Sequence, residues 1–135
     1  MSIQEVHDYL KARHIKPSIQ RTAIMQYLLE HANHPDADRI YCELIPSMPT
    51  LSKTTVYNTL KLFYDKKAVN MLFIDEKNVR YDGHTHVHAH FRCKKCDAIH
   101  DVMLEESDIP VCRSSMELLP EETQIYFLGR CKSCA

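Results

Sequence analysis

The chain has 135 residues, and its charges nearly balance, with 17 Lys and Arg against 18 Asp and Glu, so bulk charge does not indicate a nucleic-acid partner. Its two glycines exclude a glycine-rich phosphate loop and disfavour a nucleotide-dependent enzyme. No apolar run approaches the roughly 20 residues that span a bilayer, and the N-terminus lacks a signal-peptide core, so we expect a cytoplasmic protein with no membrane partner.

The first part of the chain has the apolar spacing of helices, interrupted at prolines. Helices are expected near residues 2–13, 18–31, 36–47 and 53–66. The stretch Asn-His-Pro-Asp at 33–36 is a helix-entry signal, with proline before an acidic first turn. Thr50 or Ser52 can cap the fourth helix through its hydroxyl.

The pattern changes after the fourth helix, where residues 68–74 and 79–82 flank the polar turn 75–78. This predicts a β-hairpin. Helices followed by a hairpin indicate a winged helix-turn-helix, whose second motif helix enters the DNA major groove. On that helix Val56 and Leu60 are expected to face the core. The polar candidates for DNA contact are Ser52, Lys53, Thr54, Thr55, Tyr57, Asn58 and Lys61.

These candidates suit different parts of a duplex. Lys53 and Lys61 would contact phosphates, and Thr55 or Asn58 a base edge. Tyr57 could contact a thymine methyl group or a phosphate. Any one of them could equally be a solvated helix residue, because one helix offers more polar side chains than a site uses.

From residue 84 onward the pattern predicts mostly strands. Strands are expected in 87–93, 98–104 and 123–129, with one short helix within 107–119. We place the boundary at Asp82-Gly83, which gives a DNA-binding domain at 1–82 and a second domain at 83–135. The predicted fold class is α+β: a winged helix-turn-helix domain plus a small C-terminal α/β domain.

Two identical Cys-x-x-Cys pairs lie in the second domain, at Cys93 and Cys96 and at Cys131 and Cys134. This spacing lets four thiolates hold one tetrahedral zinc, which would stabilise a domain too small for a large core. A thioredoxin-like redox pair or two local disulfides are the alternatives. Of the other two cysteines, Cys42 is expected to be a small buried apolar residue, and Cys112 a candidate redox-active thiol.

Histidines recur at every second position before the first cysteine pair. In an extended segment one face would carry His84, His86, His88 and His90, and the other Thr85, Val87, Ala89 and Phe91. Asp82 and Asp101 are the nearby carboxylates. Imidazole and carboxylate ligands suit Fe(II), Mn(II), Zn(II) or Co(II), so this would be a second site, distinct from the thiolate one. A solvated strand face is the alternative.

The segments 16–44, 51–69 and 86–102 together resemble the ferric uptake regulator (Fur) superfamily over nearly the whole chain. The resemblance implies a homodimeric, metal-dependent transcriptional regulator that binds double-stranded DNA, with the C-terminal domain dimerising. By motif, the structural zinc falls on Cys93, Cys96, Cys131 and Cys134. The regulatory metal falls on His34, Asp82, His88, His90 and Asp101. Because His34 belongs to the DNA-binding half, the metal would act as a clamp between the domains.

The chain departs from the family pattern in two places. Iron-sensing members often carry histidines at the positions of Val87 and Thr123 and an acidic residue at that of Ala89, which form an additional site, so that site is expected to be absent here. Lys67 stands after the recognition helix, where the family commonly has glycine. Asp82 and Asp101 resemble the peroxide-sensing PerR branch, in which bound iron reacts with peroxide and a ligand histidine is oxidised. His84 and His86 match no ligand position.

We therefore expect a metal-dependent repressor that senses peroxide through a regulatory iron or manganese. The alternatives are an iron- or zinc-uptake regulator without peroxide chemistry, and a haem- or thiol-based redox regulator using Cys112. An enzyme is not expected, since the sequence has neither the H-E-x-x-H helix of zinc hydrolases nor the deaminase signature.

Overall fold

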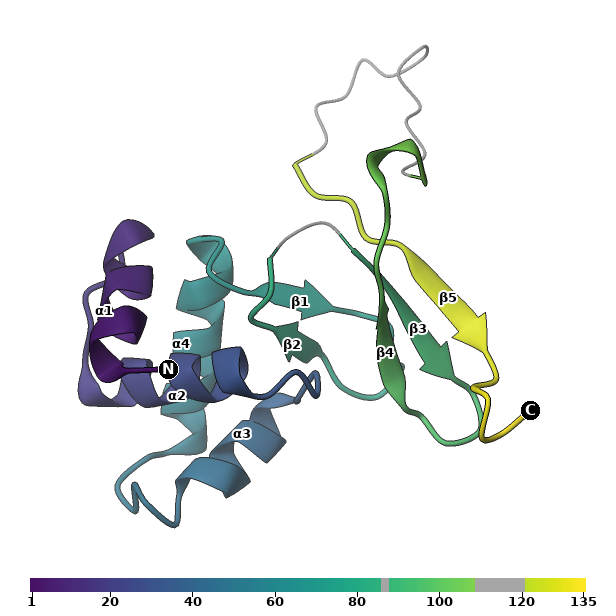
Figure 1. Cartoon of the computed structure of the whole chain (residues 1–135). Helices are drawn as coiled ribbons and strands as arrows, with labels where there is room; N and C mark the ends of the chain where they lie inside the picture. The colour runs from purple at the N-terminus through teal and green to yellow at the C-terminus, as the bar shows by residue number, and fades with distance from the viewer. Residues whose placement is uncertain (86–87, 109–120) are drawn as a thin grey trace. The chain divides into compact units, whose positions relative to one another are not determined.

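The computed structural model describes residues 1–85, 88–108 and 121–135 and has an α+β fold (Figure 1). Its backbone forms two units, Met1–Thr85 and His86–Ala135. The N-terminal unit contains four helices, α1 (Ile3–Ala12), α2 (Ile19–Glu30), α3 (Ala37–Leu44) and α4 (Lys53–Asp65). These are the four helices that the sequence predicts, each slightly shorter than expected.

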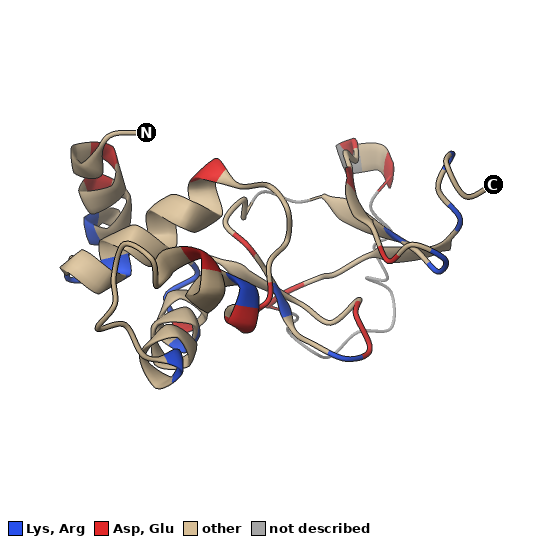
Figure 2. Ribbon diagram, turned by 90° about the horizontal axis from the view of Figure 1, so that it is seen from below, with Lys and Arg blue, Asp and Glu red and all other residues tan. Residues whose placement is uncertain are grey.

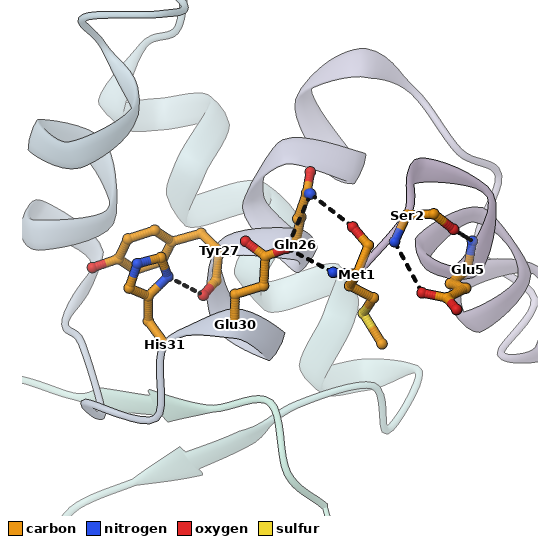
Figure 3. Close-up of polar contacts among 7 residues, drawn as sticks. All are labelled: Met1, Ser2, Glu5, Gln26, Tyr27, Glu30 and His31. Carbon is orange, nitrogen blue, oxygen red and sulfur yellow. Dashed lines mark hydrogen bonds and ion pairs between the residues drawn. The ribbon is translucent and has the colours of Figure 1, made fainter.

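Side-chain caps define where the helices begin. Ser2, Ser18, Asp36 and Ser52 each accept a hydrogen bond from the backbone N–H three residues further on. Of the two predicted caps for α4, Ser52 is the one used. Figure 3 shows the start of α1, where Ser2 and Glu5 form a capping box. In the same view the Met1 ammonium lies 3.3 Å from a Glu30 carboxylate oxygen, which links the start of α1 to the end of α2.

The core of the N-terminal unit lies among the four helices. Its largest side chains with no more than 1% exposure are Leu10, Ile24, Met25, Leu28, Ile40, Leu60 and Phe63. Val56 and Leu60 face this core, as predicted from their spacing on α4. Burying an aliphatic or aromatic side chain of this size contributes about 1.5–3 kcal/mol, so the shared core holds the helices together.

Cys42 does not belong to this core. The sequence predicts a buried position, but the structure places the side chain on the exposed side of α3. That helix buries Ala37 and Ile40, and a residue two positions after Ile40 lies about 200° further around the helix. Cys42 therefore points away from the face that packs.

A β-hairpin follows α4, as predicted. Strand β1 (Asn70–Leu72) pairs antiparallel with β2 (Arg80–Asp82), with Asn70 opposite Asp82 and Leu72 opposite Arg80. We call β1, β2 and the turn 75–78 the wing. The backbone of Gly83, directly after β2, approaches α2 so closely that a Cβ atom there would lie 3.1 Å from the Leu28 carbonyl oxygen. A larger residue at position 83 would therefore push the wing and α2 slightly apart.

The C-terminal unit contains a three-stranded sheet in the order β4-β3-β5 (Figure 1). Its strands are β3 (Ala89–Cys93), β4 (Ile99–Val102) and β5 (Tyr126–Gly129). A 3-10 turn at Glu106–Asp108 follows β4. Strand β3 pairs antiparallel with β4 and parallel with β5. All three predicted strands are present but shorter than expected. The predicted short helix and Cys112 fall largely or wholly on residues 109–120, outside the described residues.

Within the described residues, no helix combines the length and the apolar character needed to cross a bilayer.

Helices α1 and α4 end in the same way. After α4, Lys67 has a left-handed backbone (φ 60°), its N–H donates to the Tyr64 carbonyl at 2.9 Å, and the Ala68 N–H donates to the Phe63 carbonyl at 2.8 Å. This pair of bonds is a Schellman motif, whose left-handed position is usually glycine. His14 (φ 61°) has the corresponding position after α1. The lysine is therefore accommodated, at a steric cost, where the family commonly has glycine.

We predict that Lys67→Gly stabilises the N-terminal unit. A side chain in the left-handed region costs about 1–2 kcal/mol, which glycine avoids. Glycine loses about 0.5–1 kcal/mol more backbone entropy on folding, so the free energy of unfolding should rise by the difference, roughly 0.5–1 kcal/mol. Urea denaturation followed by circular dichroism measures the change. Lys66→Gly is the matched control, because Lys66 has φ −91° and glycine there should destabilise the unit. A lower midpoint for Lys67→Gly would contradict this account of the helix end.

Candidate metal centres

The four cysteine sulfurs of the two Cys-x-x-Cys pairs lie within 4.8 Å of one another. The Cys96 and Cys131 sulfurs are 3.8 Å apart. Zinc–sulfur bonds of about 2.3 Å in a tetrahedron put the sulfurs about 3.8 Å apart, so this spacing fits a zinc ion. The geometry disfavours the redox alternative, because all four sulfurs converge on one point instead of forming two separate pairs. The cluster suits a structural zinc.

The sheet brings these cysteines together. Cys93 is the last residue of β3, and Cys96 lies in the turn that leads to β4. The Asp97 N–H donates to the Cys93 carbonyl at 2.9 Å, and Asp97 has φ 60°, which tightens the turn. On the other side, Cys93 pairs with Gly129 of β5. Cys131 and Cys134 follow two and five residues after Gly129, so the parallel pairing delivers the second pair to the first.

The thiols of the cluster differ strongly in acidity. Backbone N–H groups, first that of Cys131 and then that of Cys96, lower the pKa of the Cys93 thiol to about 6. A side-chain hydrogen bond with Cys131, followed by burial, raises the pKa of Cys134 to about 12. Neighbouring thiols so close together cannot all ionise by themselves, whereas a divalent cation requires and stabilises the thiolates. Zinc binding at this cluster would therefore release protons.

A second group of metal-binding side chains lies in the C-terminal unit, and we call it the C-terminal cluster: His88, His90 and Asp101. The Nε2 atoms of His88 and His90 lie 3.5 and 3.4 Å from the same Asp101 oxygen, Oδ1. The two imidazole rings are 4.4 Å apart between centroids. Donors on one ion at about 2.1 Å stand about 3.0 Å apart in an octahedron and about 3.4 Å in a tetrahedron, so these three fit one cation.

The strand register explains this cluster. His90 of β3 lies directly opposite Asp101 of β4. Facing residues of an antiparallel pair have Cβ atoms about 4.5–5.5 Å apart, and residues two apart share a face, so His88 joins them. The alternating face predicted from sequence is therefore present at His88 and His90. Ala89, on the other face, is completely buried.

The structure describes only part of the rest of the histidine tract. The His84 backbone N–H donates to Asp82 Oδ1 at 2.9 Å. His86 and Val87 lie outside the described residues. Of the other two positions of the family's additional site, Ala89 is packed in the core and Thr123 is exposed.

The N-terminal unit holds two further predicted ligands, which we call the N-terminal pair: His34 and Asp82. His34 Nε2 lies 3.9 Å from Asp82 Oδ2, and both side chains are 3% exposed. His34 precedes α3 and has a left-handed backbone (φ 49°), while Asp82 ends β2. Two donors on one ion are separated by about 3.0–4.3 Å for bonds of about 2.1 Å, so this pair could share a cation.

Strand β2 holds the His34 segment in place. Arg80 Nη1 donates to the His34 carbonyl at 2.8 Å, and the Tyr81 N–H donates to the Pro35 carbonyl at 2.9 Å. Sequence reasoning did not single out Arg80. Its position two residues before Asp82 on a strand, and hence on the same face, was the available signal.

The seven candidate DNA-contacting residues lie on α4 and at its N-cap. Lys53, Thr54, Tyr57, Asn58 and Lys61 are exposed, as is Ser52. Thr55 is only partly exposed, and both its N–H and its hydroxyl contact Ser52 Oγ, at 3.0 and 2.9 Å. The capping function of Ser52 and Thr55 leaves the other five freer to contact a ligand.

The wing adds two candidate DNA-contacting residues that the sequence analysis missed, Lys77 and Asn78. A hollow of about 240 Å³ lies between Tyr57 of α4, the start of α3, and Lys77 and Asn78 of the wing turn. Figure 2 shows basic and acidic segments interspersed over the helices of this unit, with no continuous basic stripe. Lys53 itself lies 3.9 Å from Asp38. Contact with DNA would thus depend on a few placed side chains more than on net charge.

Comparison with known proteins identifies the family. The model of the ferric uptake regulator family matches residues 12–114. The chain is 34% identical over 129 residues to the peroxide-responsive repressor PerR of Staphylococcus epidermidis, covering 93% of this chain and 85% of that protein. The chain belongs to the ferric uptake regulator family. It is therefore a metal-responsive regulator of transcription and not an enzyme, and the family binds DNA as dimers.

Solved structures agree with this assignment. The fold is similar to that of the ferric uptake regulator of Helicobacter pylori, with a TM-score of 0.74 and 18% identity over 99% of this chain and 94% of that one. It is also similar to PerR from Streptococcus pyogenes, with a TM-score of 0.54 and 30% identity over 98% of this chain and 92% of that one. Both protein groups named in the resemblance are thus among the structural neighbours of this chain.

We predict that Cys96→Ser removes the structural zinc. A hydroxyl is a far poorer zinc ligand than a thiolate, and binding of structural zinc contributes about 10–16 kcal/mol to small zinc domains, so the C-terminal unit should lose its strands. Elemental analysis and circular dichroism measure both effects. Cys42→Ser is the matched control and should keep its zinc, because Cys42 is an exposed residue of α3. One tight zinc per chain in Cys96→Ser would refute a four-thiolate site.

Proposed function

We propose that this chain is a homodimeric repressor, acting in the cytoplasm, whose binding to operator DNA requires a regulatory iron or manganese ion, and that iron in this site makes it a sensor of peroxide. The observation that carries the proposal is the convergence of His88, His90 and Asp101 on one point, separate from the four cysteines. Imidazole and carboxylate donors suit exchangeable iron or manganese, whereas four thiolates suit permanent zinc.

We propose that one ion takes ligands from both the N-terminal pair and the C-terminal cluster. The set is His34, Asp82, His88, His90 and Asp101, with three nitrogen and two oxygen donors. The family resemblance supports this grouping, as does the donor spacing within each group. A ligand shifts a conformational equilibrium only through its differential affinity for the two states. Donors drawn from two units give such a difference, because only one relative placement of the units satisfies them all.

In this proposal residues 1–82 bind DNA and residues 83–135 dimerise. Helix α4 would enter the major groove, where Lys53 and Lys61 contact phosphates and Tyr57 and Asn58 reach bases. At the start of α4, hydroxyl groups would contact the sugar-phosphate backbone of the DNA; they belong to Ser52, Thr54 and Thr55. Two recognition helices in a dimer would meet half-sites about 34 Å apart, one helical turn of DNA.

The outer edge of β5 supports the dimer. In the described part of the chain β5 pairs with β3 alone, so its other edge is open to a second strand. Phe127 and Leu128 on β5 are 47% and 52% exposed, and an unpaired strand edge with exposed apolar side chains favours pairing with another chain. A second copy of the chain that pairs along β5 would cover both features.

Peroxide sensing is supported by the two aspartates and by the PerR relatives, and it requires iron, because zinc undergoes no redox change. When bound, iron would supply the redox chemistry. The chain's contribution is to hold His34, His88 and His90 next to the metal, where a histidine can be oxidised. Manganese in the same site would keep the repressor active without this chemistry.

We predict that His34→Ala uncouples DNA binding from metal. The variant should bind Mn²⁺ at least about tenfold more weakly and keep its zinc, because the four cysteines are untouched. Binding to a duplex selected from random sequence, with and without Mn²⁺, measures the coupling. His100→Ala is the matched control, since His100 is an exposed residue of β4 adjacent to Asp101 but on the opposite face. Retained Mn²⁺-dependent DNA binding in His34→Ala would exclude the clamp.

We also predict that peroxide adds oxygen to ligand histidines only in the iron-loaded protein. Protein loaded anaerobically with Fe²⁺ and treated with peroxide should gain oxygen on the peptides that carry His34 or His88, as peptide mass spectrometry would detect. Protein loaded with Mn²⁺ is the control and should gain none there. If the iron-loaded peptides stay unmodified while Fe²⁺-dependent DNA binding persists, the chain is a metal-uptake regulator without peroxide chemistry.

A further inference from the structure

The backbone at His34 is held in an unfavourable conformation. A left-handed residue other than glycine costs roughly 1–2 kcal/mol, and His34, with φ 49°, also precedes a proline, which restricts its backbone further. Such a conformation persists only where the surrounding structure fixes it, and it is typical of functional sites.

Arg80 makes the contact to the strained residue itself. Its Nη1 donates to the His34 carbonyl at 2.8 Å, and its Nε donates to Asp75 Oδ2 at 3.0 Å. The Arg80 and Asp75 side chains are only 21% and 18% exposed, so this ion pair is partly shielded from solvent. Arginine suits this position because its rigid fork can donate in two directions at once.

Asp75 extends the chain of contacts to the tip of the wing. Its second oxygen, Oδ1, accepts the Lys77 N–H at 2.9 Å, which shapes the turn 75–78. Backbone hydrogen bonding from Lys77, together with Arg80, keeps the pKa of Asp75 below its usual value, as expected for a carboxylate engaged on both oxygens. A continuous path of hydrogen bonds thus runs from the Lys77 amide through Asp75 and Arg80 to His34.

We infer that Arg80 is a positioning residue that holds His34 ready to bind the regulatory cation and links it to the turn of the wing. This inference rests on the proposed metal site. Groups that orient metal ligands typically change affinity by 10–100-fold when they are removed. Because coupling between sites is reciprocal, cation binding at His34 also stabilises the shape of the turn beside α4.

The sign of the effect separates positioning from plain electrostatics. Arg80 carries a positive charge two residues from Asp82, so its removal should strengthen cation binding if charge alone mattered. If Arg80 positions His34, its removal should weaken cation binding instead. The two explanations therefore predict opposite changes for Arg80→Gln.

The experiment uses the full chain with its zinc in place and titrates Mn²⁺, with free Mn²⁺ followed by electron paramagnetic resonance. Arg80→Gln should bind Mn²⁺ about tenfold more weakly than the wild type. Arg39→Gln is the matched control, because Arg39 is an exposed arginine of α3, and its affinity should be unchanged. Unchanged or tighter Mn²⁺ binding in Arg80→Gln would overturn the inference.

A second readout needs no metal. In metal-free Arg80→Gln, hydrogen exchange at the Tyr81 amide, which donates to the Pro35 carbonyl, should be faster than in the wild type, because the segment is less restrained. Wild-type exchange in the peptide that covers Tyr81 would contradict the positioning role. Circular dichroism and zinc content show whether the variant is folded.

Two further variants complete the test. If Arg80→Gln does not fold, Asp75→Asn replaces it, since this change leaves Arg80 present but weakens its anchor, and unchanged Mn²⁺ affinity there would overturn the inference. His34→Ala in the same titration separates this inference from the proposed function. Unaltered Mn²⁺ binding in His34→Ala would refute the proposed site, whereas a loss there with none in Arg80→Gln would refute only the role of Arg80.

Discussion

The C-terminal unit depends on the convergence of four cysteine sulfurs at one end of its sheet. Cys93 and Cys96 close the turn between β3 and β4, and Cys131 and Cys134 follow β5. A strand that slips by one residue turns every side chain to the opposite face. By fixing the strands at this end, the cysteines place Asp101 opposite His90. The cysteine cluster therefore also sets the geometry of the C-terminal cluster of His88, His90 and Asp101.

The N-terminal unit positions its two candidate ligands, His34 and Asp82, through its own packing and hydrogen bonds. His34 and Asp82 come from distant parts of the chain and are brought together by β2 and the loop before α3. Two hydrogen bonds from β2, donated by Arg80 and Tyr81, hold this loop despite its strained backbone. The unit can maintain this arrangement because its helical core has many fully or almost fully buried side chains, among them Leu10, Leu28 and Phe63.

Sequence reasoning succeeded where the signal was local. The serine cap of α4, the helix spacing and the paired cysteines each lie within a few residues of the element they define, so the fold class and the cysteine cluster followed from the chain alone. It failed where a contact joins distant segments. The place of Arg80 on the same strand face as Asp82 is an indirect signal that names no partner 46 residues away at His34, and the exposure of Cys42 depends on which face of α3 packs. The left-handed backbone of Lys67 is likewise imposed by the end of α4, against the preference of its side chain.

Preorganisation of the ligands decides how far a bound metal shifts such a regulator toward its DNA-binding arrangement. In the proposed mechanism an ion that bound both domain arrangements equally would shift nothing, and a change from about 1:99 to 99:1 requires roughly a 10⁴-fold difference in affinity. A ligand that must first be ordered reduces that difference, because the ordering cost is subtracted from the binding free energy. Because Arg80 already holds the backbone of His34, more of the metal–ligand interaction remains to favour the DNA-binding arrangement. The strength of this one restraint should therefore set the metal concentration at which repression begins.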